Sequence, residues 1–224
     1  MSPIQPLIDH IMIPFLTYSY NSIYPNYAIA IILLTIVIKA ALYPLTKKQF
    51  DSMKKMQVLQ PQFKELKVKY KKDPQRIQQE TIKLYKENNV NPLGGCLPLI
   101  IQLPFLFALF YTMSSDAFNA LITAPGVFPG LTTFWLPNLA DPDHSYILPV
   151  LIGVSTFLSQ KFSTVDAQQQ KIMMFMPAIM VVICVKMPAG VLLYWAVSQI
   201  IGTAQQYFIM NPKKETAISK GATK

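Results

Sequence analysis

Few side chains in this sequence could do chemistry, and a single cation stands out among them. Lys39 lies twelve residues into an apolar stretch that begins near Tyr27. At about 1.5 Å of rise per residue it would sit about 18 Å along that helix, within a hydrocarbon core about 30 Å thick. A charge at such depth costs roughly 2.5 to 3.5 kcal/mol and usually faces protein or a water-filled cavity. Two interpretations remain: Lys39 lines a wet cavity, or its stem extends to the inner interface.

Polar side chains on the other apolar stretches favour the cavity. Thr35 precedes Lys39 by one helical turn, and Gln102 lies within a second apolar stretch. The candidate groove residues are Thr35, Lys39, Gln102, Tyr194, Trp195, Ser198 and Gln199, with Ser155, Ser159, Gly202 and Gln206 as neighbours. Each alone is more often an interhelical hydrogen-bonding residue. Because no acidic residue lies within these stretches, a groove that they line would be positive and would suit an acidic or polar guest.

Residues for catalysis or ion coupling are missing from the apolar stretches. His10 and His144 are far apart, and no carboxylate pair, Cys–His set or phosphate loop accompanies them. A proton- or ion-coupled transporter would carry Asp, Glu or His within the membrane, and no inverted repeat is detectable. Cys96 and Cys184 lie in apolar surroundings and are expected to be buried, inert thiols. We therefore expect a protein that is not an enzyme and uses no metal or cofactor.

The elements that hold these residues follow from composition. Hydrophobic residues make up 52% of the chain and charged residues 14%, against roughly 25% charged in a typical soluble domain. This excludes a disordered chain and a disulfide scaffold, and it predicts an all-α integral membrane protein. The five candidate transmembrane helices are 27–46, 96–113, 146–160, 172–185 and 189–210. The third and fourth are short for a full crossing.

Basic residues predict the topology. Of the 20 Lys and Arg, eighteen lie in 47–86, at Lys161 and Lys171, or in the tail 211–224, and Lys186 is the exposed exception. These segments share one side of the membrane only if all five stretches cross, which puts the N-terminus outside and the C-terminus in the cytoplasm. The expected organisation is an outer interfacial segment (1–26) without a removable signal peptide, transmembrane helix 1 (27–46), a cytoplasmic hairpin (47–90), transmembrane helices 2–5 (91–210) with an outer loop (114–145), and a basic cytoplasmic tail (211–224).

The polar segment 47–90 predicts an antiparallel helical hairpin. Apolar residues recur at three- and four-residue spacing from Met53 to Tyr70 and again from Ile77 to Tyr85, while Asp73 supplies an N-cap between them. Twelve Lys or Arg against five acidic residues suit either anionic headgroups, at about 1 kcal/mol per Lys, or RNA and other acidic partners. Aromatic residues interleaved for base stacking are missing, so no specific nucleic-acid sequence is expected to be recognised. The candidate docking residues are Lys54, Lys55, Lys64, Lys67, Lys69, Lys71, Lys72 and Arg76.

A series of motifs resembles the YidC/Oxa/Alb membrane protein insertase family, in a short form without a large outer domain. The motifs are LTIVIK (34–39), YPLTK (43–47), MKKM (53–56), LQP (59–61), NPLGGCLP (91–98), QQKIM (169–173), FMP (175–177) and LYWAVS (193–198). The resemblance implies five helices around a positive groove, open to cytoplasm and lipid, which accepts nascent membrane-protein segments and releases them into the bilayer. Lys39 then matches a groove cation that is Arg in many bacterial members, and Thr35 and Trp195 match groove-lining positions.

The resemblance also implies partners and a location. Nascent membrane proteins are the expected substrates, and the ribosome, the signal-recognition receptor, the Sec translocon and anionic lipids are candidate partners. The bacterial plasma membrane is the expected site, with the thylakoid membrane as the alternative. Two other functions remain open, which are a small channel or carrier that uses the same groove and a chaperone that acts after insertion.

Overall fold

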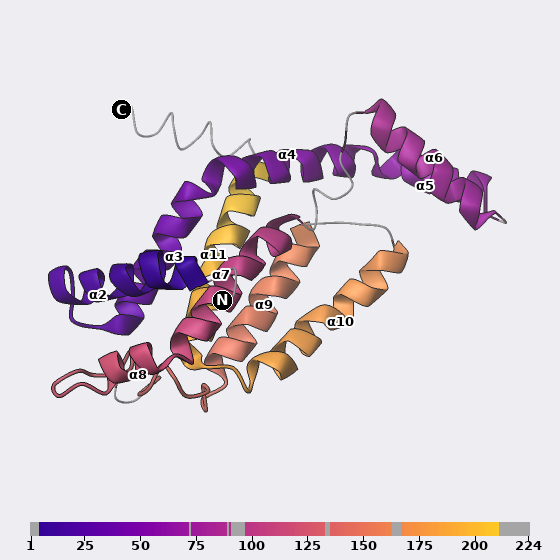
Figure 1. The fold of residues 1–224 in the computed structure, drawn as a ribbon. Helices are drawn as coiled ribbons and strands as arrows, with labels where there is room; N and C mark the ends of the chain where they lie inside the picture. The colour runs from indigo at the N-terminus through magenta and orange to yellow at the C-terminus, as the bar shows by residue number, and fades with distance from the viewer. Residues whose placement is uncertain are drawn as a thin grey trace, which may run out of the picture.

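The computed structural model describes residues 5–71, 73–88, 90, 97–132, 135–162 and 167–210 of the chain. Within them the fold is all-helical, and it resembles a bundle with a helical arm at one end (Figure 1). The elements are α1 (Gln5–Leu7), a π-helical turn η1 (Ile8–Met12), α2 (Ile13–Ser22), α3 (Tyr27–Ala41), α4 (Tyr43–Val58), α5 (Gln60–Lys69), α6 (Pro74–Glu87), α7 (Leu97–Met113), α8 (Asp116–Ile122), α9 (Ile147–Phe162), α10 (Ala167–Cys184) and α11 (Ala189–Met210).

The predicted first span, 27–46, is divided between two helices. Asn26 starts α3, because its side-chain oxygen accepts hydrogen bonds from the amides of Ala28 at 2.8 Å and Ile29 at 3.2 Å. The helix ends at Ala41, and α4 leaves it at an angle of 62°. Pro44 lies in the first turn of α4, where its missing N–H costs nothing, whereas within a continuous helix it would remove a hydrogen bond. The bend therefore follows from Pro44.

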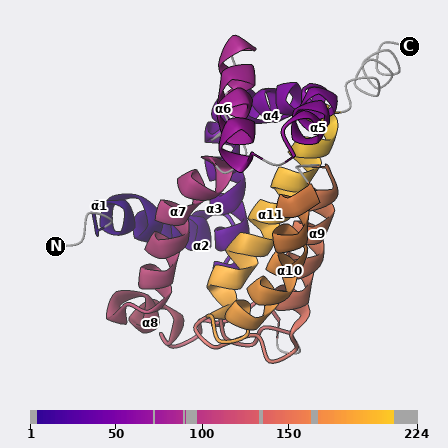
Figure 2. The same ribbon diagram turned by 90° about the vertical axis from the view of Figure 1, so that its right-hand side faces the viewer.

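Helix α11 is the centre of the bundle. It packs against α3, α4, α7 and α9, and α10 packs against α9 (Figure 2). Two glycines allow close approach: a Cβ at Gly190 would lie 2.7 Å from the Met113 sulfur, and one at Gly153 would lie 2.6 Å from a methyl of Val181. The first turns of α11 are accordingly buried, and Cys184 at the end of α10 has 0% of its surface exposed.

The N-terminal helices cover one side of this core. Ile8, Met12 and Leu16 repeat at four-residue spacing and are buried against it, as expected for one face of a helix. Chain segment 5–22 is thus a packed part of the bundle as well as a candidate interfacial segment.

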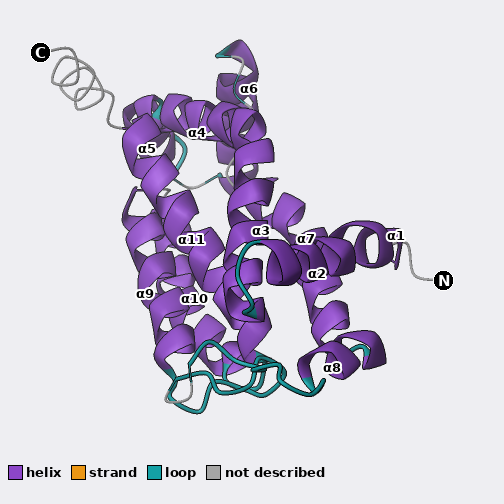
Figure 3. Ribbon diagram, turned by 90° about the vertical axis from the view of Figure 1, so that its left-hand side faces the viewer, coloured by secondary structure: helices purple, strands orange, loops and turns teal. Residues whose placement is uncertain are grey.

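Most loop segments gather at the end of the bundle that carries α8 (Figure 3). The helix α8 lies within the expected outer loop, where Ser115 caps it by accepting from the Phe118 amide at 3.2 Å. The buried carboxylate of Asp143 accepts from the Leu148 amide at 2.8 Å and so caps α9. The amides of Ala189 and Gly190 donate to the carbonyls of Asp141 and Leu139. These bonds join the loop to the first turns of α9 and α11.

The expected hairpin contains three helices where two were predicted. The helix before the tip is interrupted near Leu59, since Pro61 in the first turn of α5 cannot donate to the preceding turn. The predicted apolar faces do meet, with the rings of Phe63 and Tyr85 5.6 Å apart. The predicted N-cap is confirmed, because the Asp73 carboxylate accepts from the Arg76 amide at 3.0 Å.

A helix that spans a membrane needs about 20 predominantly apolar residues. No single described helix is long and apolar enough to cross a bilayer. Two bent pairs of helices together have the length and composition: α3 with α4, and Ile101–Met113 with α8, which meet at 63°. Ile147–Gln160 and Phe175–Cys184 are shorter apolar helices.

Candidate functional site

Three helices meet at Lys39. Its Nζ, on α3, donates to the Oε1 of Gln102 on α7 at 3.4 Å, and the Nε2 of Gln102 donates to the hydroxyl of Tyr194 on α11 at 2.6 Å. The three residues are 63 and 92 positions apart along the chain. The structure thus joins three of the predicted groove residues into one polar chain, which we call the Lys39–Gln102–Tyr194 chain.

The three residues of this polar chain differ in their exposure to solvent. Lys39 and Gln102 are partly exposed, whereas Tyr194 is 1% exposed and lies among apolar side chains. Gly202 of α11 is also partly exposed, and a Cβ built on it would lie 3.9 Å from the Lys39 Nζ. The polar chain therefore runs from a partly exposed Lys39 to an enclosed Tyr194, and Gly202 leaves space beside the Lys39 ammonium.

The Lys39 ammonium has no acidic neighbour among the described residues. Within the described part of the chain no carboxylate lies within 4.0 Å of its Nζ, and the ion pair between Lys83 and Glu87 lies away from it on α6. A neutral amide is thus the recorded partner of the ammonium. Such a group can attract a carboxylate, because a charge-assisted hydrogen bond is roughly twice as strong as a neutral one.

The other predicted groove residues have different surroundings. Thr35 is 0% exposed, and its hydroxyl donates to the Ile31 carbonyl of its own helix at 2.7 Å. Ser198 is buried as well. Trp195 is partly buried and packs against the apolar core, and Gln199 is partly exposed. Sequence reasoning placed these side chains in one set, and the structure links only Lys39, Gln102 and Tyr194 by the hydrogen bonds described above.

A second polar contact lies between α9 and α11. The Ser159 hydroxyl donates to the Oε1 of Gln206 at 2.7 Å, and the Nε2 of Gln206 donates to the Ser159 carbonyl at 3.3 Å. Gln206 is 1% exposed, so this reciprocal pair fastens two helices together. Its role as interhelical hydrogen bonding is the alternative that the sequence left open.

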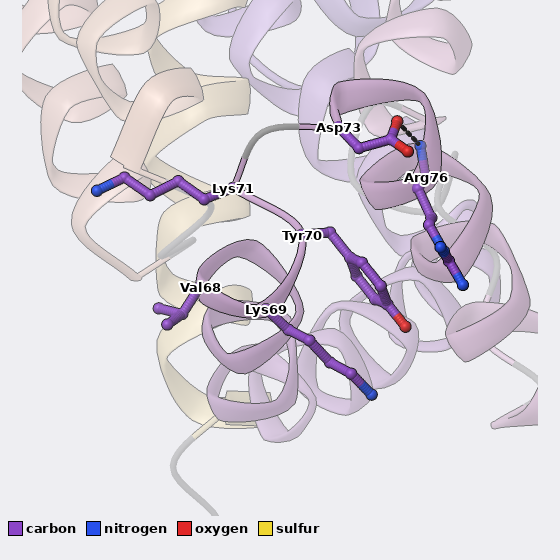
Figure 4. Close-up of a pocket in the computed structure, with 6 residues that line it drawn as sticks. All are labelled: Val68, Lys69, Tyr70, Lys71, Asp73 and Arg76. Carbon is purple, nitrogen blue, oxygen red and sulfur yellow. Dashed lines mark hydrogen bonds between the residues drawn. The ribbon is translucent and has the colours of Figure 1, made fainter.

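The tip of the hairpin forms a basic hollow of about 370 Å³. The Lys69 Nζ and the Arg76 guanidinium lie 5.3 and 4.9 Å from the centre of the Tyr70 ring, on either side of it (Figure 4). Lys71 points away from the ring. Of the predicted docking residues, Lys55, Lys64, Lys69, Lys71 and Arg76 are exposed, Lys54 and Lys67 are partly exposed, and Lys72 lies outside the described residues.

Comparison with known proteins identifies the family. The 60Kd inner membrane protein family matches residues 18–216, which is most of the chain. The chain belongs to this family. It is 45% identical over 212 residues to a membrane protein insertase YidC from Fusobacterium nucleatum, with 94% of this chain and 98% of that protein covered. It is 50% identical over 192 residues to the YidC of Mannheimia succiniciproducens, where the match covers 84% of this chain. The protein is thus a membrane protein.

A solved structure supports the fold. The crystal structure of an active YidC insertase with its first transmembrane domain resolved is similar with a TM-score of 0.73 and 28% sequence identity, over 93% of this chain and 47% of that one. The chain spans about a third of the Mannheimia relative and nearly all of the Fusobacterium relative. The YidC/Oxa/Alb resemblance is therefore confirmed, together with an all-helical fold of this kind.

The described residues contain no group of three or more His, Cys, Asp or Glu side chains that could hold an ion.

Proposed function

We propose that this protein is a membrane protein insertase that receives polar parts of nascent membrane proteins at the Lys39–Gln102–Tyr194 chain. The observation that carries the proposal is a partly exposed lysine on α3 whose ammonium donates to a neutral amide from α7. Relatives named membrane protein insertase, at 45 to 50% identity, support it. The activity of this chain, its substrates and its groove are inferred from these two facts together.

The proposed mechanism needs no chemical step. A carboxylate in the short outer tail of a substrate exchanges with the Gln102 carbonyl at the Lys39 ammonium, which lowers the cost of bringing charge part-way across the bilayer. The apolar helix of the substrate then moves into lipid, with a gain of roughly 25 cal/mol for each Å² of apolar surface removed from water. The short apolar helices α9 and α10 would thin the bilayer locally and shorten the path.

The proposal includes a topology. Five crossings, by α3, α7, α9, α10 and α11, put the hairpin and the tail in the cytoplasm and the α8 loop outside. Placement of the hairpin and α8 at opposite ends of the bundle supports this arrangement (Figure 1). The bacterial plasma membrane is the proposed location, in keeping with the bacterial relatives.

The insertase proposal is tested with purified protein in liposomes. A single-span substrate with an acidic outer tail is compared with the same substrate carrying a neutral tail. Lys39→Ala should slow insertion of the acidic substrate selectively, and Lys39→Arg should retain it because the charge remains. Lys186→Ala is the matched control, since it removes an exposed Lys in the turn before α11. Unchanged insertion of the acidic substrate by Lys39→Ala would refute this role for Lys39.

The same liposomes test the competing function. A channel or carrier would release a trapped ion or solute without any substrate protein, whereas an insertase would not.

We further propose that the hairpin tip binds anionic headgroups. Its α5 and α6 helices slope from α4 back towards the level at which α9 and α10 end (Figure 1), where headgroups would lie in the proposed topology. The exposed Lys69 and Arg76 are held there beside Tyr70. Replacement of both by Gln should weaken contact of the tip with vesicles that contain anionic lipid, by about 1 kcal/mol for each charge removed.

Fluorescent labels near the tip report that contact. Replacement of Lys83 and Lys86 by Gln removes the same formal charge from α6 away from the tip, and it is the control for a change in net charge. Equal losses in the two double variants would mean that the tip has no particular role, and a loss confined to ribosome binding would indicate an RNA or protein partner instead.

A further inference from the structure

Tyr194 takes part in the polar chain without being accessible. Its ring is 1% exposed and belongs to the apolar core, and only its hydroxyl meets Gln102, at 2.6 Å. A buried tyrosine hydroxyl usually requires a hydrogen-bond partner, and this one has it on α7. A substrate segment would meet Lys39 and Gln102 before it could reach Tyr194.

The hydrogen-bonding capacities of the three groups fix the direction of the Gln102 amide. A lysine ammonium carries three donors and no acceptor, so the amide oxygen must face Lys39. The amide NH₂ then faces Tyr194, whose hydroxyl oxygen accepts. A rotation of the amide by 180° would place its two donors against the ammonium. The ammonium itself opposes this rotation, and the short bond to Tyr194 anchors the Gln102 side chain on α11.

The two bonds of Gln102 are unequal. Its bond to Tyr194 is short at 2.6 Å, and its bond from Lys39 is long at 3.4 Å. Gln102 is therefore fixed more firmly to α11 than to the cation. This arrangement holds the ammonium in place and leaves its charge uncompensated, whereas a carboxylate partner would neutralise it.

We propose that Tyr194 is a positioning residue that selects for acidic substrate segments by fixing the Gln102 amide, so that the Gln102 carbonyl is the resting partner that a substrate carboxylate displaces from Lys39. This inference rests on the proposed insertase function. It assigns contact with substrate to Lys39 and Gln102, and an indirect role to Tyr194.

Two substitutions separate these roles. Tyr194→Phe keeps the ring in the core and removes the acceptor, so Gln102 loses its anchor on α11 and holds the Lys39 ammonium less firmly. The preference for an acidic over a neutral tail, measured as the ratio of insertion rates in proteoliposomes, should fall roughly three- to tenfold, the equivalent of one hydrogen bond. Gln102→Glu is nearly isosteric and neutralises Lys39. It should abolish the preference altogether.

The double variant gives the decisive measurement. Gln102→Leu removes the amide that Tyr194 anchors but leaves the Lys39 charge, so part of the preference should remain. Tyr194→Phe should have no further effect on the ratio in a Gln102→Leu background, which is the coupling expected of residues that act through one another. Tyr27→Phe is the matched control, because Tyr27 on α3 is equally buried and lies outside the polar chain.

The outcomes distinguish this inference from the proposed function. If the wild-type protein inserts neither substrate, the insertase proposal fails. If Lys39→Ala abolishes the preference for acidic tails but Tyr194→Phe retains it, the insertase proposal stands and the positioning role is overturned. If Tyr194→Phe slows both substrates equally in either background, Tyr194 is structural only, which also overturns the inference.

Discussion

A side chain at Gly202 is expected to raise stability and lower function at the same time. Gly202 lies within α11, and beyond its chain neighbours and the nearby backbone of its own helix the described atom within 4 Å of a Cβ built there is the Lys39 Nζ, at 3.9 Å. That distance is an ordinary van der Waals contact, so alanine fits without displacing its neighbours. Glycine in a helix interior is less favourable than alanine by about 1 kcal/mol. Gly202→Ala should therefore raise the free energy of unfolding by up to about 1 kcal/mol.

The expected loss of function arises at the Lys39 ammonium. A carboxylate would approach the Lys39 Nζ to about 2.8 Å, and bulk on Gly202 occupies one side of that approach. A hydrogen bond to a charged group contributes roughly 1.5 to 3 kcal/mol, and each 1.4 kcal/mol is tenfold in an equilibrium. Gly202→Leu, which fills the space completely, should slow insertion of an acidic-tailed substrate by tenfold or more. Gly202→Ala should have a smaller effect of the same sign.

Two assays check the two effects separately. Thermal unfolding in detergent, followed by tryptophan fluorescence, gives the stability, and proteoliposome insertion with acidic and neutral tails gives the function. Ala204→Leu is the matched control, because Ala204 is exposed on the same helix and receives the same bulk. If Gly202→Leu inserts the acidic substrate at the wild-type rate, substrate does not approach Lys39 from the α11 side, and the reasoning is refuted. A loss of stability in Gly202→Ala would refute the packing argument.

Two further predictions concern stability. Asn26→Ala should lower the free energy of unfolding by about 0.5 to 2 kcal/mol, because α3 loses its N-cap. Asn21→Ala, on the exposed face of α2, is the control and should have little effect. Equal losses of stability in a thermal scan of the two variants would contradict the capping role. Gln206→Leu should cost about 1 to 3 kcal/mol because both hydrogen bonds of the reciprocal pair are lost, and Ser159→Ala should cost less in that background than on its own. Equal costs of Ser159→Ala in the two backgrounds would mean that the pair does not fasten α9 to α11.

Local rules predicted the elements whose ends are set by nearby residues. The apolar stretch 189–210 coincides with α11, and the Asp73 cap was predicted correctly, because each depends on residues within a few positions. The bend at Pro44 and the break before Pro61 were missed, although both prolines were visible. Apolar periodicity runs through both positions, and it outweighed the missing N–H in the prediction.

The sequence could not show that the small and polar residues of α11 face different neighbouring helices. Gly202 and Gln206 fall on one face by spacing, yet Gly202 lies beside Lys39 of α3 and Gln206 bonds to Ser159 of α9. Spacing describes a helix alone, whereas α11 has neighbours on several sides that divide its polar residues between them. The burial of Tyr194 depends on the same packing. Its position next to Trp195 gave no indication that one ring would be enclosed and the other would remain partly exposed.

Cys184 gives the protein an internal reporter. Its thiol is fully buried at the end of α10, two residues before the exposed Lys186. In a Cys96→Ser background, a thiol reagent can modify it only when the packing around this end of the bundle loosens. The modification rate therefore measures how often that end opens, on the unaltered helix and without an introduced label. Comparing the rate with and without an engaged substrate would show whether insertion loosens the loop end of the bundle or leaves it closed.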